Sequence, residues 1–187
     1  RLSLVGSEMC IRDRQYVGRA KEIQKAEKER MNGGHPCQAV PVLKDVMGEV
    51  KKQYPEADRK NTGFGSTIFA VKPGDGSARE QAASCQKVLG GWADIANEYA
   101  TKRYRSNLIN WGMLPFLIQP GDLPFKNLDY LFVPGIKKAV EDKAEEIKAY
   151  VVTPGEGMKE FSLKLGELTD EERQIILKGC LINYNRV

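Results

Sequence analysis

The sequence predicts an α+β protein in which helices and strands are mixed in one ordinary domain. The 187 residues are enough for one domain with a hydrophobic core. Hydrophobic residues make up 41% of the chain and charged residues 29%, a balance typical of globular proteins and not of disordered ones. Helix-like and strand-like segments are interspersed along the chain, which is the third observation in favour of a mixed fold.

The first third is predicted to be helical and to lead into a strand. Residues 15–31 are rich in Lys, Glu, Gln and Ala, which favour a helix, and their few apolar positions indicate a surface helix. Residues 40–54 carry apolar side chains at helical spacing and predict a second, amphipathic helix. The apolar, β-branched run at 66–71 predicts a buried strand.

A glycine-rich turn then opens the next helix. Ser77 suits the N-cap position, and Glu80 three residues later completes the spacing of a capping box. This helix is expected to run to Leu89, where a Gly-Gly pair ends it. Beyond it we expect, in order, a short strand, a helix and an extended segment at residues 92–96, 98–111 and 113–118.

The final third predicts three short strands and two helices. The apolar stretches that indicate strands are at 130–133, 150–153 and 161–165. A charged helix is expected at 136–148 and a last helix at 169–179. Thr169 is placed to cap the last helix, and acidic residues in its first turn suit the helix dipole.

Composition argues against several classes of protein. The formal net charge is +4, and no dense Lys/Arg stripe marks a nucleic-acid binder; the nearest candidate is the short patch at 102–105. No apolar run approaches the roughly 18–20 residues that a membrane span needs, and no signal peptide is evident. His35 lies in a glycine-rich loop and is interpreted as solvated. The four cysteines, which form no C-x-x-C pair, are Cys10, Cys37, Cys85 and Cys180. We therefore expect free thiols in a reducing cytoplasm, and we expect no metal site in this chain.

Residues 1–14 are set aside from the fold prediction. The stretch LVGSEMCIRDR resembles the conceptual translation of a sequencing adapter, and the chain opens with Arg1 instead of Met. We therefore interpret 1–14 as a non-native segment and the chain as a fragment of a longer protein.

Residues 73–80 are the strongest candidate for chemistry. A strand, a Gly-x-Gly turn and a helix N-terminus create an anion site, because unpaired backbone N–H groups and the helix dipole both favour negative charge. Arg79 adds a guanidinium that can hold a carboxylate through two hydrogen bonds. Ser77 can act as a base there only if local positive potential stabilises its alkoxide. The pattern alone leaves a second interpretation open, in which Ser77 is only a helix cap.

Two blocks of the chain resemble the swivel domain of the aconitase family. GDGSAREQAASCQKVLGG at 74–91 is similar to the family motif Gly-x-Gly-Ser-Ser-Arg-Glu-His-Ala-Ala, with its later Leu-Gly-Gly. RSNLINWGMLPF at 105–116 is similar to the second block, an Asn-Leu followed by Gly-(Leu, Ile or Met)-Leu-Pro. The closing TDEERQIILKGCLINYNR looks like the short C-terminal helix of such domains.

The resemblance implies a three-layer β/β/α swivelling domain over residues 61–187, with a helical lead-in at 15–60. It implies a hydro-lyase that reversibly removes water from a hydroxy-polycarboxylate of the citrate or isocitrate kind. That reaction uses a 4Fe–4S cluster, which would be bound by domains absent from this chain. Those cluster-bearing domains, or a separate large subunit, are then the implied partners. The isolated chain is expected to be inactive, and the location to be cytoplasmic.

The same resemblance assigns roles to individual residues of the first block. Ser77 matches the base that removes a proton from the carbon next to a carboxylate, and Arg79 matches the carboxylate anchor. Gly76, Ala78 and Arg79 are the expected substrate-binding residues. Ala78 stands where the family has a second Ser, so it offers only its backbone N–H and leaves the identity of the substrate open.

Other positions are interpreted as structural or leave alternatives open. Gln81 replaces the more usual His of the motif but can still form hydrogen bonds. In the second block Asn107 and Arg105 look structural, and Arg105 is expected to form a salt bridge. One alternative function is a non-catalytic swivel module that binds an anion or a partner. Another is RNA binding through the basic patch at 102–105, which would depend on salt.

Overall fold

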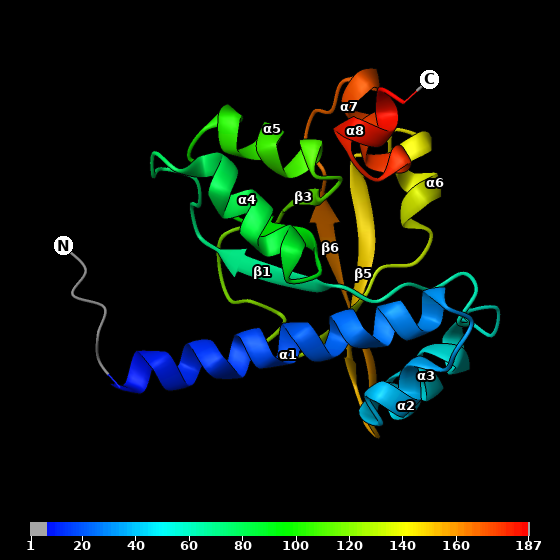
Figure 1. The fold of residues 1–187 in the computed structure, drawn as a ribbon. Coiled ribbons are helices and arrows are strands. Elements are labelled where there is room, and N and C mark those ends of the chain that lie inside the picture. Colours follow the sequence, from blue (N-terminus) through cyan, green and yellow to red (C-terminus); the bar gives the residue numbers. More distant parts are fainter. Residues whose placement is uncertain (1–6, 187) are drawn as a thin grey trace.

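The computed structural model describes the backbone of residues 7–186 and the side chains of residues 16–186. Helices surround one six-stranded mixed sheet (Figure 1). The strands are β1 (Ser66–Ala70), β2 (Gly91–Ala96), β3 (Leu114–Leu117), β4 (Tyr130–Phe132), β5 (Glu146–Thr153) and β6 (Gly157–Lys164). The helices are α1 (Ser7–Met31), α2 (Pro36–Ala39), α3 (Val42–Gln53), α4 (Arg79–Val88), α5 (Lys102–Asn110), α6 (Ile136–Glu141), α7 (Asp170–Lys178) and α8 (Leu181–Tyr184).

The sheet has two halves that differ in strand direction. Its strand order is β1-β2-β3-β6-β5-β4. The first three strands are parallel, with α4 and α5 as the connecting helices, whereas β6, β5 and β4 are antiparallel. The halves meet in a single residue pair, Leu117 with Lys164. The α+β prediction is therefore confirmed, with the strands held in two halves of one sheet and not in two separate sheets.

Two of the four buried clusters among the described residues support the parallel half of the sheet and its helices. The larger contains Ile95 and Phe116 from the parallel half together with Ile147 and Leu163 from the antiparallel half. A smaller cluster lies beneath α4 and α5 and is formed by Ala83, Tyr104, Leu108 and Met113. Because fully buried apolar side chains each contribute about 1.5–3 kcal/mol, both helices are firmly attached to the sheet. The loop between β1 and α4 is therefore flanked by elements that are firmly packed.

Helix α1 lies on the surface of the domain, as predicted, and packs one side against it (Figure 1). Ile23 and Ala26 are buried, and the buried Glu27 carboxylate accepts a hydrogen bond from the backbone N–H of Phe64 at 2.9 Å. These few apolar residues are enough to hold the helix on the domain, because they lie on one side of it. The hydrogen bond between Glu27 and Phe64 adds to their packing. The helix also begins at Ser7, inside the segment set aside above; residues 1–6 of that segment lie outside the described residues.

Two further elements differ from their sequence predictions. Strand β1 was expected to be buried, but it lies at the edge of the sheet and its Ile68 side chain is 45% exposed. The helix expected at 136–148 ends at Glu141, because Lys143 adopts a left-handed backbone conformation with a φ of 57°. The β-branched and aromatic residues that follow join β5 instead. Among the described residues, no helix has both the length and the apolar character that crossing a membrane requires.

A pair of glycine substitutions tests the packing between α5 and the C-terminal helices. Gly112 follows α5 with a φ of +68°, and a Cβ there would lie 1.9 Å from the carbonyl oxygen of Gly179. We expect Gly112→Ala to lower the free energy of unfolding by at least about 2 kcal/mol, from backbone strain plus the clash. Gly48→Ala in α3 is the control, because its Cβ would meet nothing within 4 Å and Ala favours a helix. Urea unfolding measures both; equal stability of the two variants would contradict the packing described.

Candidate anion-binding site

The candidate site is the loop of residues 71–78, between β1 and α4. Its carbonyl groups are bound by the segment that precedes α5. The three hydrogen bonds are Glu98 N to Val71 O at 3.1 Å, Ala100 N to Pro73 O at 2.9 Å and Thr101 Oγ1 to Gly74 O at 3.1 Å. The loop therefore lies along residues 98–101, which explains why α5 begins at Lys102 and not at the predicted Glu98.

The two glycines of the loop have different surroundings. Gly74 has a φ of +98°, and a Cβ on it would lie 2.5 Å from the Cβ of Tyr104. Only glycine satisfies both the backbone conformation and the close packing on Tyr104. Gly76 has no left-handed conformation, and a Cβ on it would meet nothing within 4 Å. The space next to Gly76 is therefore open to a ligand.

The prediction that Ser77 caps α4 is wrong. The N-cap residue is Ala78, which forms no side-chain cap hydrogen bond, and the helix starts at Arg79. Glu80 does not complete a capping box either, because its carboxylate accepts a hydrogen bond from Trp111 Nε1 at 2.8 Å. Ser77 is exposed, one residue ahead of the cap. Its hydroxyl is thus not used to begin the helix, and no side chain among residues 16–186 accepts a hydrogen bond from the first-turn N–H groups of α4.

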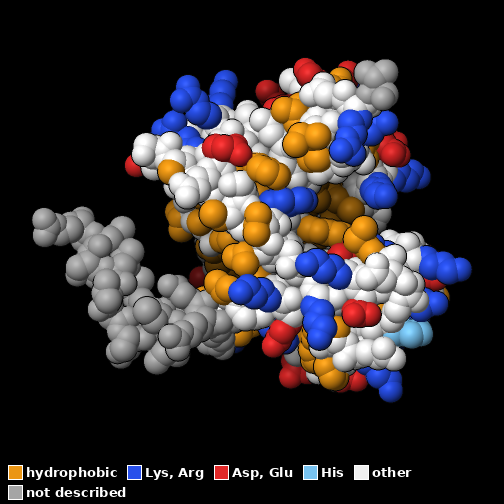
Figure 2. Space-filling view, viewed as in Figure 1, with side chains coloured by type: hydrophobic (Ala, Val, Ile, Leu, Met, Phe, Trp, Pro, Cys, Tyr) orange, Lys and Arg blue, Asp and Glu red, His pale blue; other side chains and the backbone are white. Residues whose placement is uncertain are grey.

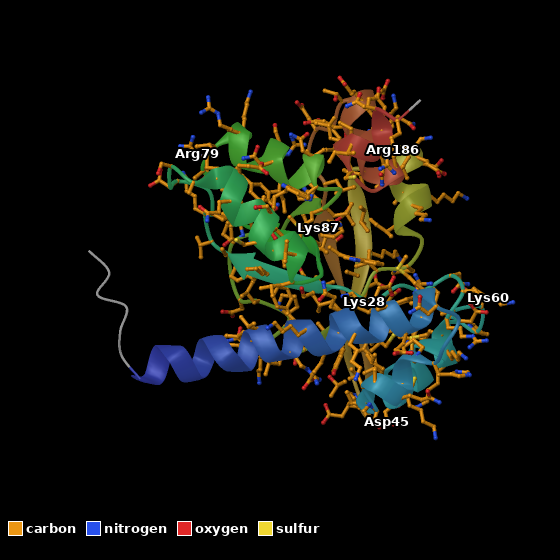
Figure 3. All side chains as sticks on the ribbon, in the orientation of Figure 1. Lys28, Asp45, Lys60, Arg79, Lys87 and Arg186 are labelled. Carbon is orange, nitrogen blue, oxygen red and sulfur yellow. The ribbon has the colours of Figure 1, made fainter. Side chains whose placement is uncertain are left out.

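Arg79 is held at the start of α4 by the loop itself. Its Nε donates a hydrogen bond to the carbonyl oxygen of Gly74 at 3.0 Å, and the side chain is only partly exposed. None of the salt bridges among the described residues involves Arg79. Figure 3 labels Arg79 at the end of α4 that faces away from the core. The guanidinium is therefore oriented by one nitrogen while its other two remain available to an anion. The loop's own carboxylate, Asp75, is exposed.

The surroundings of the loop are positively charged. Helices α4 and α5 begin on the same side of the molecule, so the positive ends of two helix dipoles lie near the loop (Figure 1). Lys102 and Arg103 in the first turn of α5 are exposed, and Figure 2 shows Lys and Arg side chains gathered over this end, at the upper left. Of the carboxylates nearby, Glu98 is paired with Lys72 Nζ at 2.9 Å. The carboxylates of Asp75 and Glu80 offset part of this charge, and the remaining cations with the two helix N-termini favour an anion.

A buried polar network lies beneath the loop, and the sequence reasoning missed it. The carboxyl group of Asp94 in β2 is almost fully buried, with Oδ2 accepting a hydrogen bond from the Tyr104 hydroxyl at 2.9 Å. Gln86 Nε2 in turn donates to the Tyr104 hydroxyl at 3.2 Å. Burial raises the pKa of Asp94 to about 6, although the polar groups of Tyr104 and Gln86 act in the opposite direction. The one available signal was an Asp in the apolar strand GWADIA.

The remaining residues singled out from the sequence lie outside this loop. Arg105 joins α5 to α7 through Nη1 and Glu172 Oε1 at 3.5 Å, which confirms the expected salt bridge. His35 is next to Arg59, whose Nη1 lies 3.4 Å from its Nε2, in the loop before α2. Cys37, Cys85 and Cys180 are free thiols, and Cys10 lies outside the described side chains.

No cluster of metal ligands accompanies the loop. Within the described part of the chain, no group of three or more His, Cys, Asp or Glu side chains is arranged to hold a metal ion. The residues present therefore do not fit a 4Fe–4S cluster, which needs several cysteine thiolates in one place. What the arrangement can do is bind an anion between a fixed guanidinium, helix N–H groups and an exposed serine hydroxyl.

Comparison with known proteins matches this part of the molecule to one family. Residues 35–121 match the family model described as aconitase C-terminal domain, a range that includes the loop, α4 and α5. The chain is also similar to aconitate hydratase A of Rickettsia bellii (strain RML369-C), with 28% identity over 132 residues. That alignment covers 68% of this chain and 15% of the relative, so the chain spans a small part of that protein's length. The resemblance seen in the sequence is confirmed to this extent: residues 35–121 match the model of the aconitase C-terminal domain family.

Proposed function

We propose that this chain is the swivel-domain part of an iron–sulfur hydro-lyase that reversibly removes water from a citrate- or isocitrate-like hydroxy-polycarboxylate. The observation that carries the proposal is the loop 74–78, which leads into a helix start that no side chain caps, with Arg79 fixed beside it. The match to the aconitase C-terminal domain family supports the reaction class. A polycarboxylate suits the site because each carboxylate is an anion with two acceptor oxygens.

In this proposal Arg79 is the carboxylate anchor. Its Nε is already bound to Gly74 O, so the position of the guanidinium is set before substrate arrives. A preset guanidinium loses less conformational freedom on binding than a mobile one. The open space at Gly76 and the backbone N–H of Ala78 complete the substrate-binding surface. A methyl group at Ala78 supplies no hydroxyl donor, so recognition there depends on the backbone and the substrate identity stays open within the class.

Ser77 is the proposed base. It would remove the proton from the carbon next to the bound carboxylate, passing through an alkoxide that is costly in water. Two features favour that alkoxide: the N-terminus of α4 immediately follows, and the guanidinium of Arg79 lies two residues away. Because Ala78 and not Ser77 is the cap residue, the hydroxyl is not committed to the helix.

The iron–sulfur cluster of the proposal lies in domains outside this chain, which are also the proposed partners. A bound metal supplies Lewis-acid chemistry at a leaving hydroxyl. Nothing among the described residues would hold it, and the isolated chain is expected to be inactive. The free thiols of Cys37, Cys85 and Cys180 fit a reducing cytoplasm, in which we propose that the protein works.

Replacing Ser77 tests the base. In the complete enzyme, with its cluster-bearing part and reconstituted cluster, we expect Ser77→Ala to lower kcat for citrate or isocitrate by about 10²–10⁴, the contribution of a general base. Ser84→Ala is the matched control, because Ser84 lies two turns along and its hydroxyl only donates to Gln81 O within α4. Near-normal turnover of Ser77→Ala would rule out the base and favour a non-catalytic, anion-binding module.

Replacing Arg79 tests the anchor separately. We expect Arg79→Lys to raise KM for the same substrates by about 10- to 100-fold, because a point charge cannot replace a two-pronged contact to carboxylate. Arg103→Lys, in the exposed first turn of α5, is the control and should leave KM unchanged. Steady-state kinetics of the complete enzyme measure both, and equal KM values for the two variants would remove Arg79 from the binding site.

A further inference from the structure

Two residues outside the loop connect it to the buried interior. The Tyr104 side chain is 3% exposed, and its Cβ and ring atoms are the atoms that a Cβ on Gly74 would strike, at 2.5–2.7 Å. The backbone N–H of Tyr104 also donates to Thr101 Oγ1, and this same hydroxyl donates to Gly74 O. Tyr104 therefore contacts the loop both through its ring and through Thr101.

The hydroxyl group of Tyr104 is fixed at its other end by Asp94. Asp94 is 3% exposed in the central strand β2 of the parallel half, and its Oδ2 accepts the Tyr104 hydroxyl hydrogen at 2.9 Å. Gln86 in α4 donates to the same hydroxyl. The chain of contacts thus runs from β2 through Tyr104 to Gly74, whose carbonyl oxygen accepts from Arg79 Nε.

We propose that Asp94 and Tyr104 are positioning residues for the loop: the buried carboxyl group fixes the Tyr104 ring, and the ring fixes Gly74 and hence the Arg79 guanidinium. Neither residue faces the open side of the loop, so they act through Gly74 and not by touching a ligand. Their effect on a hydro-lyase reaction rests on the proposed function above. Their effect on the loop itself does not depend on it.

A proton on Asp94 suits the buried polar atoms around it. Asp94 Oδ1 and Gln86 Oε1 are both buried acceptors without a hydrogen-bond partner among the described residues. A proton on the carboxyl group supplies the missing donor, which fits the raised pKa of Asp94. The other titratable groups around this site are Tyr104, whose pKa is raised by burial, and Tyr99, whose hydroxyl donates to the backbone oxygens of Asp94 and Phe116. The positive charge of Arg105 acts to lower the pKa of Tyr99, against the effect of burial.

The backbone amides of Glu98 and Ala100 report whether the loop is held. Both donate to loop carbonyls, so their hydrogen-exchange protection, measured by NMR on this chain, falls when the loop detaches. We expect Tyr104→Phe and Asp94→Ala to lower that protection about tenfold, the effect of losing one buried hydrogen bond. At a pH below about 6, where Asp94 is protonated, Asp94→Asn should keep wild-type protection, because its amide donates as the neutral acid does and still accepts from Tyr104.

Two comparisons separate positioning from general stability. Tyr54→Phe removes a hydroxyl that is bonded to Tyr150 at 2.8 Å, far from the loop, and should leave the protection of Glu98 and Ala100 unchanged. The amide of Met113, which donates to Leu108 O, should keep its protection in Tyr104→Phe. Equal losses at Met113 and at Ala100 would mean that Tyr104 only stabilises the fold, and the proposal would be overturned. Since this experiment uses no substrate, its outcome is independent of whether the hydro-lyase assignment holds.

The pH dependence gives a second test of Asp94. Its pKa of about 6 in the folded chain exceeds the value of about 3.9 for an unfolded Asp, so the folded state binds more protons between these pH values. The stability contributed by Asp94 is therefore present at low pH and lost as pH rises through about 6. We expect the urea midpoint of the wild type to fall relative to that of Asp94→Asn as pH rises from 4 to 7. A difference between the two that does not change with pH would show that Asp94 is not protonated within the network.

Discussion

The close packing of the Gly74 backbone on the Tyr104 ring is the contact on which the geometry of the site depends. Two features of this contact require glycine at position 74: the φ of +98° and the absence of a Cβ. The packing directs the Gly74 carbonyl towards two donors, Thr101 Oγ1 and Arg79 Nε. Gly74 is therefore held through its backbone, while Ser77 is exposed and Ala78 gives α4 no side-chain cap. A loop whose backbone is fixed in this way, with an exposed hydroxyl at its end, is what a binding site needs.

The parallel half of the sheet explains why the positive features collect in one place. The two connections β1–α4–β2 and β2–α5–β3 bring both helix starts to the same end of parallel strands, and the helices pack on each other. The positive charge at this end comes from the two helix N-termini, from Arg79 and from the exposed Lys102 and Arg103. Ligand sites in open α/β sheets form at this kind of edge, where the strands end and helices begin. The antiparallel half shares with the parallel half the largest hydrophobic cluster, which holds the two halves together.

Sequence patterns predicted those features that depend on local chemistry. The Thr169 cap with its acidic first turn and the glycine pair that ends α4 follow from residue types at fixed spacing. The loop and Arg79 could be singled out because a Gly-x-Gly turn before a helix N-terminus indicates an anion site. Features decided by tertiary contacts were missed. Glu80 matched a capping box, but Trp111, distant in sequence, competes for its carboxylate. Asp94 and Tyr104 lie 20 and 30 residues from Gly74, and no local pattern links them to the loop.

The central claim is that the loop and the first turn of α4 form a carboxylate site built around Arg79. Titration of the ¹⁵N-labelled chain with citrate, followed by NMR, tests it on the chain as it stands, with Arg79→Gln as the comparison. The account predicts saturable shifts concentrated on the amides of residues 76–81, which Arg79→Gln abolishes while leaving the other resonances in place. Shifts spread over exposed Lys and Arg residues of the whole surface, or shifts that persist in Arg79→Gln, would contradict it.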